Sequence, residues 1–180
     1  MVPKPRVTRD DFCVGKTAGD EQMSGVTLVR KPARALSPGD IGTCYKLVQN
    51  IQHFYEASPE GWDRRAKMSE LKHTPGLEYL LVRKDRHIAG FASFVVEDDY
   101  DDLTCLYVWE IHVSPEFLRQ KIGHQLLARL VRIAKDSSQR RIMLRCFRDN
   151  QRARSFYESE GFAAAPDLCD ETHIVYDKEI

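Results

Sequence analysis

The feature that most constrains this chain is a change of hydrophobic period at about residue 79. Upstream, apolar residues recur at helical spacing, whereas Tyr79–Val82, His87–Val96 and Leu103–Val113 read as strands. The elements expected after them are a helix over Gly123–Lys135, a strand over Arg141–Phe147, a helix over Asn150–Ser159 and a strand over Thr172–Tyr176. This order predicts a mixed α/β sheet with helices on its faces.

The first third of the chain is expected to be a strand followed by helices. Val26–Val29 is a short apolar run, and Ser37-Pro38-Gly39-Asp40 signals the start of a helix that reaches about Tyr55. A shorter helix is expected from Trp62 to about Lys72. Residues 1–25 show no periodicity and are expected to form a disordered or loosely docked tail, which leaves 26–180 as one domain.

Charge is balanced overall and uneven locally. The 27 basic residues equal the 27 acidic ones, which excludes a polycation that coats nucleic acid. Residues 119–154 hold eleven basic and two acidic residues, so this segment carries +9 and the rest −9. Within the rest, the acidic stretch 97–102 is expected to be a loop. One part of the chain therefore suits an anionic ligand and another a cationic one.

Other compositional features exclude several classes. Five cysteines without a C-x-x-C spacing argue against a disulfide framework and a zinc site, and no histidines pair at metal-ligand spacing. No run approaches the roughly 18 apolar residues that a membrane span needs. No apolar segment typical of a secretory signal follows the first residues. We therefore expect a protein of the cytoplasm and nucleus that binds neither a metal nor a membrane. We expect it to be a monomer.

Two motifs point to chemistry. In the first, the strand ending at Val113 leads through a loop with Arg119 and Lys121 into a helix. Unpaired N–H groups at a helix N-terminus favour a pyrophosphate, although an ordinary strand–helix connection can also carry two basic residues. The second motif is Asn150-x-x-Ala153-x-x-Phe156-Tyr157-x-x-x-Gly161-Phe162. It fits a capped amphipathic helix equally well.

Together, over residues 79–176, the two motifs resemble the GCN5-related N-acetyltransferase (GNAT) superfamily. The resemblance implies the GNAT fold, with a central, mostly antiparallel sheet, a coenzyme A cleft and acetyl-CoA as cosubstrate. The family's loop has a glycine where this chain has Lys121 and another at Gly123. The residues that the resemblance assigns to the cofactor are Ile111, His112, Val113, Arg119, Gln120, Lys121, Ile122, Gly123, His124, Asn150 and Tyr157.

Residues 54–67 and 107–113 are similar to the N-alpha-acetyltransferase D family. This resemblance implies direct acetyl transfer, in a ternary complex, to the N-terminal serine of histones H-four and H-two-A, whose tails begin Ser-Gly-Arg-Gly. The family has tryptophan at the position of Glu60 and tyrosine at that of Trp109. The residues implied in peptide binding are Tyr55, Trp62, Glu97, Asp99, Tyr107 and Trp109.

The expected chemistry is modest, because a thioester is already activated. Glu110 is the expected general base, acting through a water, and its alternative is a structural carboxylate in an ion pair. Tyr157 is expected to protonate the leaving thiolate, and its alternative is a core aromatic residue. Glu97 and Asp99 would bind the arginine of the tail, unless their loop is simply solvated. Backbone N–H groups over Ile111–Val113 would bind the oxyanion.

Two competing functions remain open, beside a catalytically inactive relative that only binds the cofactor, which the missing loop glycine would permit. One is a GNAT enzyme that acetylates a lysine or a small amine. The other is a nucleic-acid or nucleosome-binding module that uses the +9 segment, against which the zero net charge and the poor interleaving of aromatic residues argue.

Overall fold

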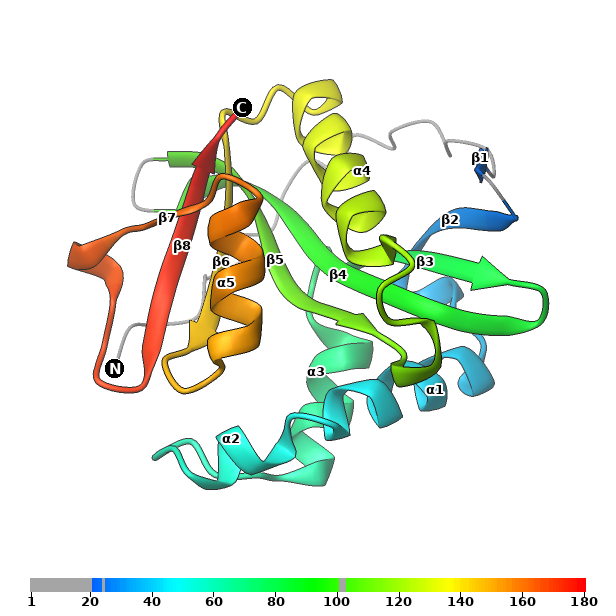
Figure 1. Cartoon of the computed structure of the whole chain (residues 1–180), viewed down its shortest axis with the longest axis horizontal. Helices are drawn as coiled ribbons and strands as arrows, with labels where there is room; N and C mark the ends of the chain where they lie inside the picture. Colours follow the sequence, from blue (N-terminus) through cyan, green and yellow to red (C-terminus); the bar gives the residue numbers. More distant parts are fainter. Residues whose placement is uncertain (1–20, 24, 101–102) are drawn as a thin grey trace.

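The computed structural model describes residues 21–23, 25–100 and 103–180, and Figure 1 shows the chain. The described strands form one sheet in the order β1-β2-β3-β4-β5-β6-β8-β7. Their bounds are β1 Glu21–Met23, β2 Val26–Pro32, β3 Glu78–Lys84, β4 His87–Tyr100, β5 Leu103–Val113, β6 Arg141–Phe147, β7 Ala163–Ala164 and β8 His173–Glu179. All neighbours are antiparallel except β5 and β6, which confirms the expected mixed, mostly antiparallel sheet.

Helices cover both faces of this sheet (Figure 1). Their bounds are α1 Pro38–Gln49, α2 Gln52–Glu56, α3 Arg64–His73, α4 Ile122–Asp136 and α5 Gln151–Ser159. One core cluster joins the sheet to α1 and α3, and the other joins it to α4 and α5. The apolar stripe of α4 that periodicity predicts is the buried one, from Leu126 and Leu127 to Leu130 and Ile133. Burial of that stripe stabilises the helix against the sheet.

The sheet opens between β5 and β6, which pair in parallel only as far as Val108 and Leu144. Beyond that register β5 continues to Val113 and β6 to Phe147 without pairing to each other. On its other edge β5 stays bonded to β4 as far as Val113. Alternate N–H groups of a strand point to opposite edges, so those of β5 that do not face β4 face this opening.

A β-bulge reorients the end of β5. Ser93 pairs with Glu110 and Phe94 with Val108, which leaves Trp109 as the extra residue. One extra residue transfers every following side chain to the opposite face of the sheet. Trp109 therefore packs with the α1–α3 cluster, while Ile111 packs with the α4–α5 cluster and Glu110 turns towards α3. The bulge determines which residues face the opening.

The structure corrects three expectations. The helix expected up to Tyr55 is two helices, α1 and α2, because the first ends at the C-cap Asn50. Residues 97–100 continue β4 instead of forming a loop. Residues 21–23 form β1 and pair with β2, so this part of the expected tail belongs to the sheet. Among the described residues, no helix is long and apolar enough to cross a membrane, and no three potential metal ligands cluster.

Candidate active site

A cavity of about 140 Å³ occupies the opening between β5 and β6. Its lining comes from both faces of the sheet: Tyr55 and Lys67 lie on the α1–α3 side, and Ala153 and Tyr157 lie on α5. The strand residues Glu110, Ile111 and His112 lie between these two walls. Two ligands entering from opposite faces could therefore meet in the gap of the sheet.

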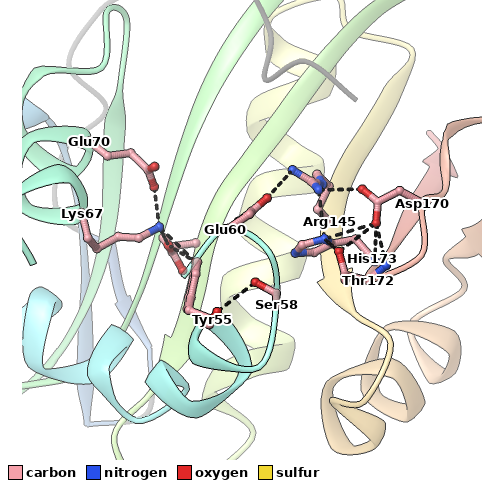
Figure 2. Close-up of polar contacts among 10 residues, drawn as sticks. Tyr55, Ser58, Glu60, Lys67, Glu70, Arg145, Asp170, Thr172 and His173 are labelled. Atoms are coloured by element: carbon pink, nitrogen blue, oxygen red, sulfur yellow. Dashed lines mark hydrogen bonds and ion pairs between the residues drawn. The ribbon is translucent and has the colours of Figure 1, made fainter. Parts of the chain in front are cut away.

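A buried ion pair forms one wall of the cavity. The Nζ atom of Lys67 on α3 lies 3.1 Å from Oε1 of Glu110, 2.7 Å from Oε1 of Glu70 and 3.0 Å from the hydroxyl of Tyr55. The Tyr55 hydroxyl also lies 3.4 Å from Oε1 of Glu110. The side chains of Lys67 and Glu110 are 8% and 5% exposed, so their charges compensate each other away from water. Figure 2 shows Lys67 between Glu70 and Tyr55.

The ion pair determines the protonation of Glu110. Burial alone raises the pKa of a carboxyl group, but the charge of Lys67 and the hydrogen bond from His112 lower the pKa of Glu110 to about 2. Burial likewise lowers the pKa of Lys67, but the charge of Glu110 outweighs it and raises that pKa overall. Glu110 is therefore a carboxylate at neutral pH and accepts a proton only weakly.

His112 contacts the second oxygen of Glu110. Its Nε2 atom lies 2.7 Å from Oε2, and its ring stacks on Phe91 of β4 with the centroids 5.5 Å apart. The two residues are two positions apart on β5 and so share a face of the strand. The sequence predicts that the backbone of His112 contacts the cofactor. The structure also places the His112 side chain in the wall of the cavity.

A second polar cluster joins the two sides of the opening. Arg145 on β6 lies 2.9 Å from both Asp170 and His173, and 3.4 Å from Glu60 in the α2–α3 segment. Figure 2 shows this guanidinium between Glu60 and the Asp170–His173 pair. Burial and the Arg145 charge lower the pKa of His173, which keeps its ring neutral. The α2–α3 segment is thereby attached to the strand on the far side of the cavity.

The aromatic residues that are expected to bind the peptide lie at the cavity or pack against its lining. Tyr55, Tyr107 and Trp109 line the cavity, and Trp62 packs edge-on against Tyr55 with the ring centroids 5.4 Å apart. Glu60, where the resembling family has tryptophan, contributes a carboxylate to the lining. The two expected acidic contacts, Glu97 and Asp99, have side chains outside the described part of the structure.

Tyr157 on α5 and Asn150 at the N-cap of that helix both line the cavity. Asn150 caps the helix by accepting a hydrogen bond from the N–H group of Ala153 at 3.2 Å, as the motif predicts. Burial, with the nearby Cys146 and Glu110, raises the pKa of Tyr157, so its phenol stays protonated at neutral pH. A protonated phenol beside the opening can donate a proton or a hydrogen bond.

The loop before α4 has the backbone shape that glycine would favour. Lys121, the N-cap of α4, has a φ of 59°, and Arg119 has a φ of 61°. This left-handed conformation costs an L-residue roughly 1–2 kcal/mol. The chain therefore keeps a strained turn at the positions of two cations, where the helix N-terminus and two positive side chains favour an anion.

The remaining residues expected to contact the cofactor have structural partners. Ile122 is buried in the α4–α5 core, and Val113 packs against that core. A Cβ atom on Gly123 would lie 3.0 Å from Phe156, so this glycine lets α4 approach α5. His124 contacts Glu160 at the end of α5, and Gln120 accepts a hydrogen bond from Lys84 at 3.1 Å. These side chains shape the loop that precedes α4.

Sequence reasoning missed Lys67, Glu70, Arg145 and His173 as site residues. Lys67 and Glu70 lie on a short, highly charged helix whose sequence reads as solvated surface. Arg145 lies among the apolar residues of β6, where a cation is unusual and could have served as a signal.

Comparison with known proteins identifies the fold. The family model described as "Acetyltransferase (GNAT) family" matches residues 46–162. The chain belongs to the GNAT acetyltransferase family. It is therefore an acetyl-CoA-dependent acetyltransferase, and the fold expected from the resemblance is confirmed.

One relative and two solved structures illustrate what the chain is similar to, and the structures show the fold alone. A Bacillus subtilis (strain 168) protein, proposed to be a ribosomal protein bS18 alanine N-acetyltransferase, is 28% identical over 119 residues, which cover 63% of this chain and 75% of that protein. The Escherichia coli ribosomal-protein-S18-alanine N-acetyltransferase has a TM-score of 0.59 at 22% identity, covering 85% of this chain and 94% of that one. The PaiA N-acetyltransferase of Thermoplasma acidophilum, solved with coenzyme A, has a TM-score of 0.62 at 18% identity, covering 88% and 100%.

Proposed function

We propose that this GNAT enzyme transfers acetyl from acetyl-CoA to the free α-amine at the N-terminus of a protein. The thioester would enter from the α4–α5 side, with its pyrophosphate at the loop of Arg119 and Lys121, and the peptide from the side of Tyr55 and Trp109. The amine would attack directly in a ternary complex. Relatives that are named for acetylating a protein N-terminus support this substrate class.

The observation that supports the proposal most strongly is the ionisation of Glu110. The carboxylate is ionised and paired with Lys67, so the site offers only a weak base. A peptide α-amine has a reference pKa of about 7.7–8.0 and a lysine about 10.4, a difference worth roughly 3 kcal/mol in the cost of deprotonation. An α-amine needs little help at neutral pH, whereas a lysine would need a stronger base than this carboxylate.

The proton transfers are part of the proposal. Glu110 serves the removal of the amine proton, directly or through a water, and Tyr157 supplies a proton to the departing thiolate. Backbone N–H groups over Ile111–Val113 would bind the oxyanion, because no described strand pairs with this part of β5 on the side of the opening.

The finer proposal is a tail that begins Ser-Gly-Arg-Gly, as in histones H-four and H-two-A. It is supported by the resemblance over residues 54–67 and 107–113 and by the grouping of Tyr55, Trp62, Tyr107 and Trp109 at the cavity. Glu97 and Asp99 are proposed to bind the arginine of the tail. Cytoplasmic and nuclear localisation belongs to the same proposal, and an N-terminus that begins with alanine is the competing substrate.

A nucleic-acid-binding role is less well supported by the described +9 segment. Arg141 pairs with Asp177, Arg145 pairs with Asp170, and Arg148 and Arg154 donate to backbone carbonyl groups. Several of its cations are thus engaged within the fold and are not arranged for phosphates.

The test is a comparison of initial rates on matched peptides. We would measure kcat/KM for peptides that begin Ser-Gly-Arg-Gly or Ala, each containing one internal lysine, with the α-amine either free or chemically blocked. Transfer is expected only to the free forms. Equal rates on blocked and free peptides would refute α-amine specificity, and a preference for the alanine peptide would replace the histone-type substrate.

A further inference from the structure

We propose that His112 accepts the proton of the attacking amine, with Glu110 and Lys67 as positioning residues behind it. The inference rests on the proposed function, because it assigns the proton acceptor of that reaction to one atom, Nδ1 of His112. It refines the part played by Glu110, which would then act through the imidazole.

The contacts of Glu110 are the first step of the argument. Oε1 faces both Lys67 at 3.1 Å and Tyr55 at 3.4 Å, while Oε2 lies 2.7 Å from His112. Each oxygen already has a partner in this chain, and the carboxylate is 5% exposed. Its paired charge also makes it a poor proton acceptor at neutral pH. A residue in this state is well suited to orient a neighbour.

The protonation of the His112 ring follows from that contact. An ionised carboxylate only accepts hydrogen bonds, so Nε2 must carry the hydrogen that it donates to Oε2. A neutral imidazole then keeps its lone pair on Nδ1, and within the described part of the chain this atom has no hydrogen-bond partner. A carboxylate that fixes the tautomer of a histidine is an arrangement suited to general-base catalysis.

The position of His112 is the third step. The bulge at Trp109 turns Glu110 and, two residues later, His112 towards the α1–α3 side, from which the peptide is proposed to enter. His112 lines the cavity together with Ile111, whose backbone belongs to the proposed thioester site. Phe91 packs against the ring from β4 and restricts its rotation.

The chemical step balances within this site. One amine proton passes to Nδ1 of His112, and the amine nitrogen forms a bond to the thioester carbonyl carbon. The carbon–sulfur bond then breaks, and the sulfur takes a proton from Tyr157. Proton exchange through water returns the proton from His112 to Tyr157. The products are the acetylated amine and the free thiol of coenzyme A.

Few described charges surround the imidazole, which makes the proposal testable by pH. Glu110 lies on its own strand, Lys67 and Glu70 come from α3, Tyr55 comes from α2, and β4 contributes the uncharged Phe91. The acid limb of the kcat profile reports groups of the bound complex. We expect the wild type and the His112 variants to differ in this limb.

The decisive variant is His112→Gln, whose amide can still donate to Glu110 but cannot accept a proton. We expect kcat to fall by roughly 10²- to 10⁴-fold, with KM nearly unchanged and the acid limb lost. In His112→Ala, added imidazole should restore part of the rate, which a purely structural role would not allow. His87→Gln, at the exposed first residue of β4, is the matched control and should behave as the wild type.

A measurement on the unmodified enzyme covers the case in which these variants fail to fold. Nitrogen NMR of the histidine rings should show His112 as the Nε2–H tautomer at neutral pH. An Nδ1–H tautomer, or a rate of His112→Gln close to that of the wild type, would overturn the proposal. If the wild type instead acetylates lysine or a small amine, the proposed function fails, and the same His112 experiments on that acceptor still decide this inference.

Discussion

Replacing Lys67 by Met tests the electrostatics of the site directly. The substitution keeps an unbranched side chain of similar length and leaves Glu110 buried without its counter-charge. Removing one partner of a buried ion pair typically costs about 3–5 kcal/mol of folding free energy. The pKa of Glu110 points the same way, because a value of about 2 against an ordinary 4.5 favours the ionised form by roughly 3 kcal/mol once the contacts with Lys67 and His112 have offset burial.

The sign of the pH dependence is fixed by the lowered pKa of Glu110. In the wild type, the stabilisation of the folded state by the ionised Glu110 is fully present above pH 4.5 and is lost as pH falls through the folded pKa of about 2. In Lys67→Met the pKa of Glu110 rises, so the carboxyl group becomes protonated at a higher pH and the cost of the substitution shrinks on acidification. Glu110→Gln should flatten the stability of the wild type between pH 5 and 2.

The assay is urea unfolding of four proteins at several pH values. These are the wild type, Lys67→Met, Glu110→Gln and the double variant, with Lys72→Met on the exposed side of α3 as control. We expect the double variant to recover most of the loss seen in Lys67→Met, and the control to lose less than about 1 kcal/mol. The reasoning would be refuted if the losses of unfolding free energy in the two single variants simply added up in the double variant. It would also be refuted if the loss in Lys67→Met did not depend on pH.

Substitutions at three further positions test other parts of the site. Lys121→Gly should raise the free energy of unfolding by about 1 kcal/mol, because glycine adopts the left-handed conformation without strain. The same variant should bind acetyl-CoA more weakly in calorimetry, because it lacks the positive side chain. Lys121→Ala should also bind acetyl-CoA more weakly, but without the gain in unfolding free energy. Gly123→Ala places a Cβ atom 3.0 Å from Phe156 and should lower the melting temperature, which an unchanged melting curve would contradict. Tyr157→Phe should lower kcat by roughly 10- to 100-fold with little change in KM, and an unchanged kcat would remove Tyr157 from proton transfer.

The sequence predicts the fold well where a pattern repeats. The strand over Arg141–Phe147 has the observed bounds, Asn150 is the N-cap of α5, and Gly161 follows the C-cap Glu160 in the left-handed conformation that glycine favours. The helical period of α4 reflects burial on one face, whereas the nearly continuous apolar runs of β3 and β6 reflect burial on both faces of the sheet.

The site was predicted less completely, because its geometry depends on pairings distant in sequence. The bulge at Trp109 exists only relative to β4, so the strand pattern alone could not show that Glu110 faces α3. Lys67 becomes a buried counter-ion only when α3 packs against that face. At Lys121 the residue type argues against a left-handed turn, and the structure retains that turn at a cost in strain.

The central claim is that the acetyl group goes to a protein α-amine. The most direct measurement is mass spectrometry of one reaction that contains acetyl-CoA and a Ser-Gly-Arg-Gly peptide with an internal lysine, with each acetyl group located by fragmentation. The account predicts a single acetyl group on the N-terminal nitrogen. Acetylation of the lysine with a free N-terminus, or an unmodified peptide under conditions in which a small amine is acetylated, would contradict it.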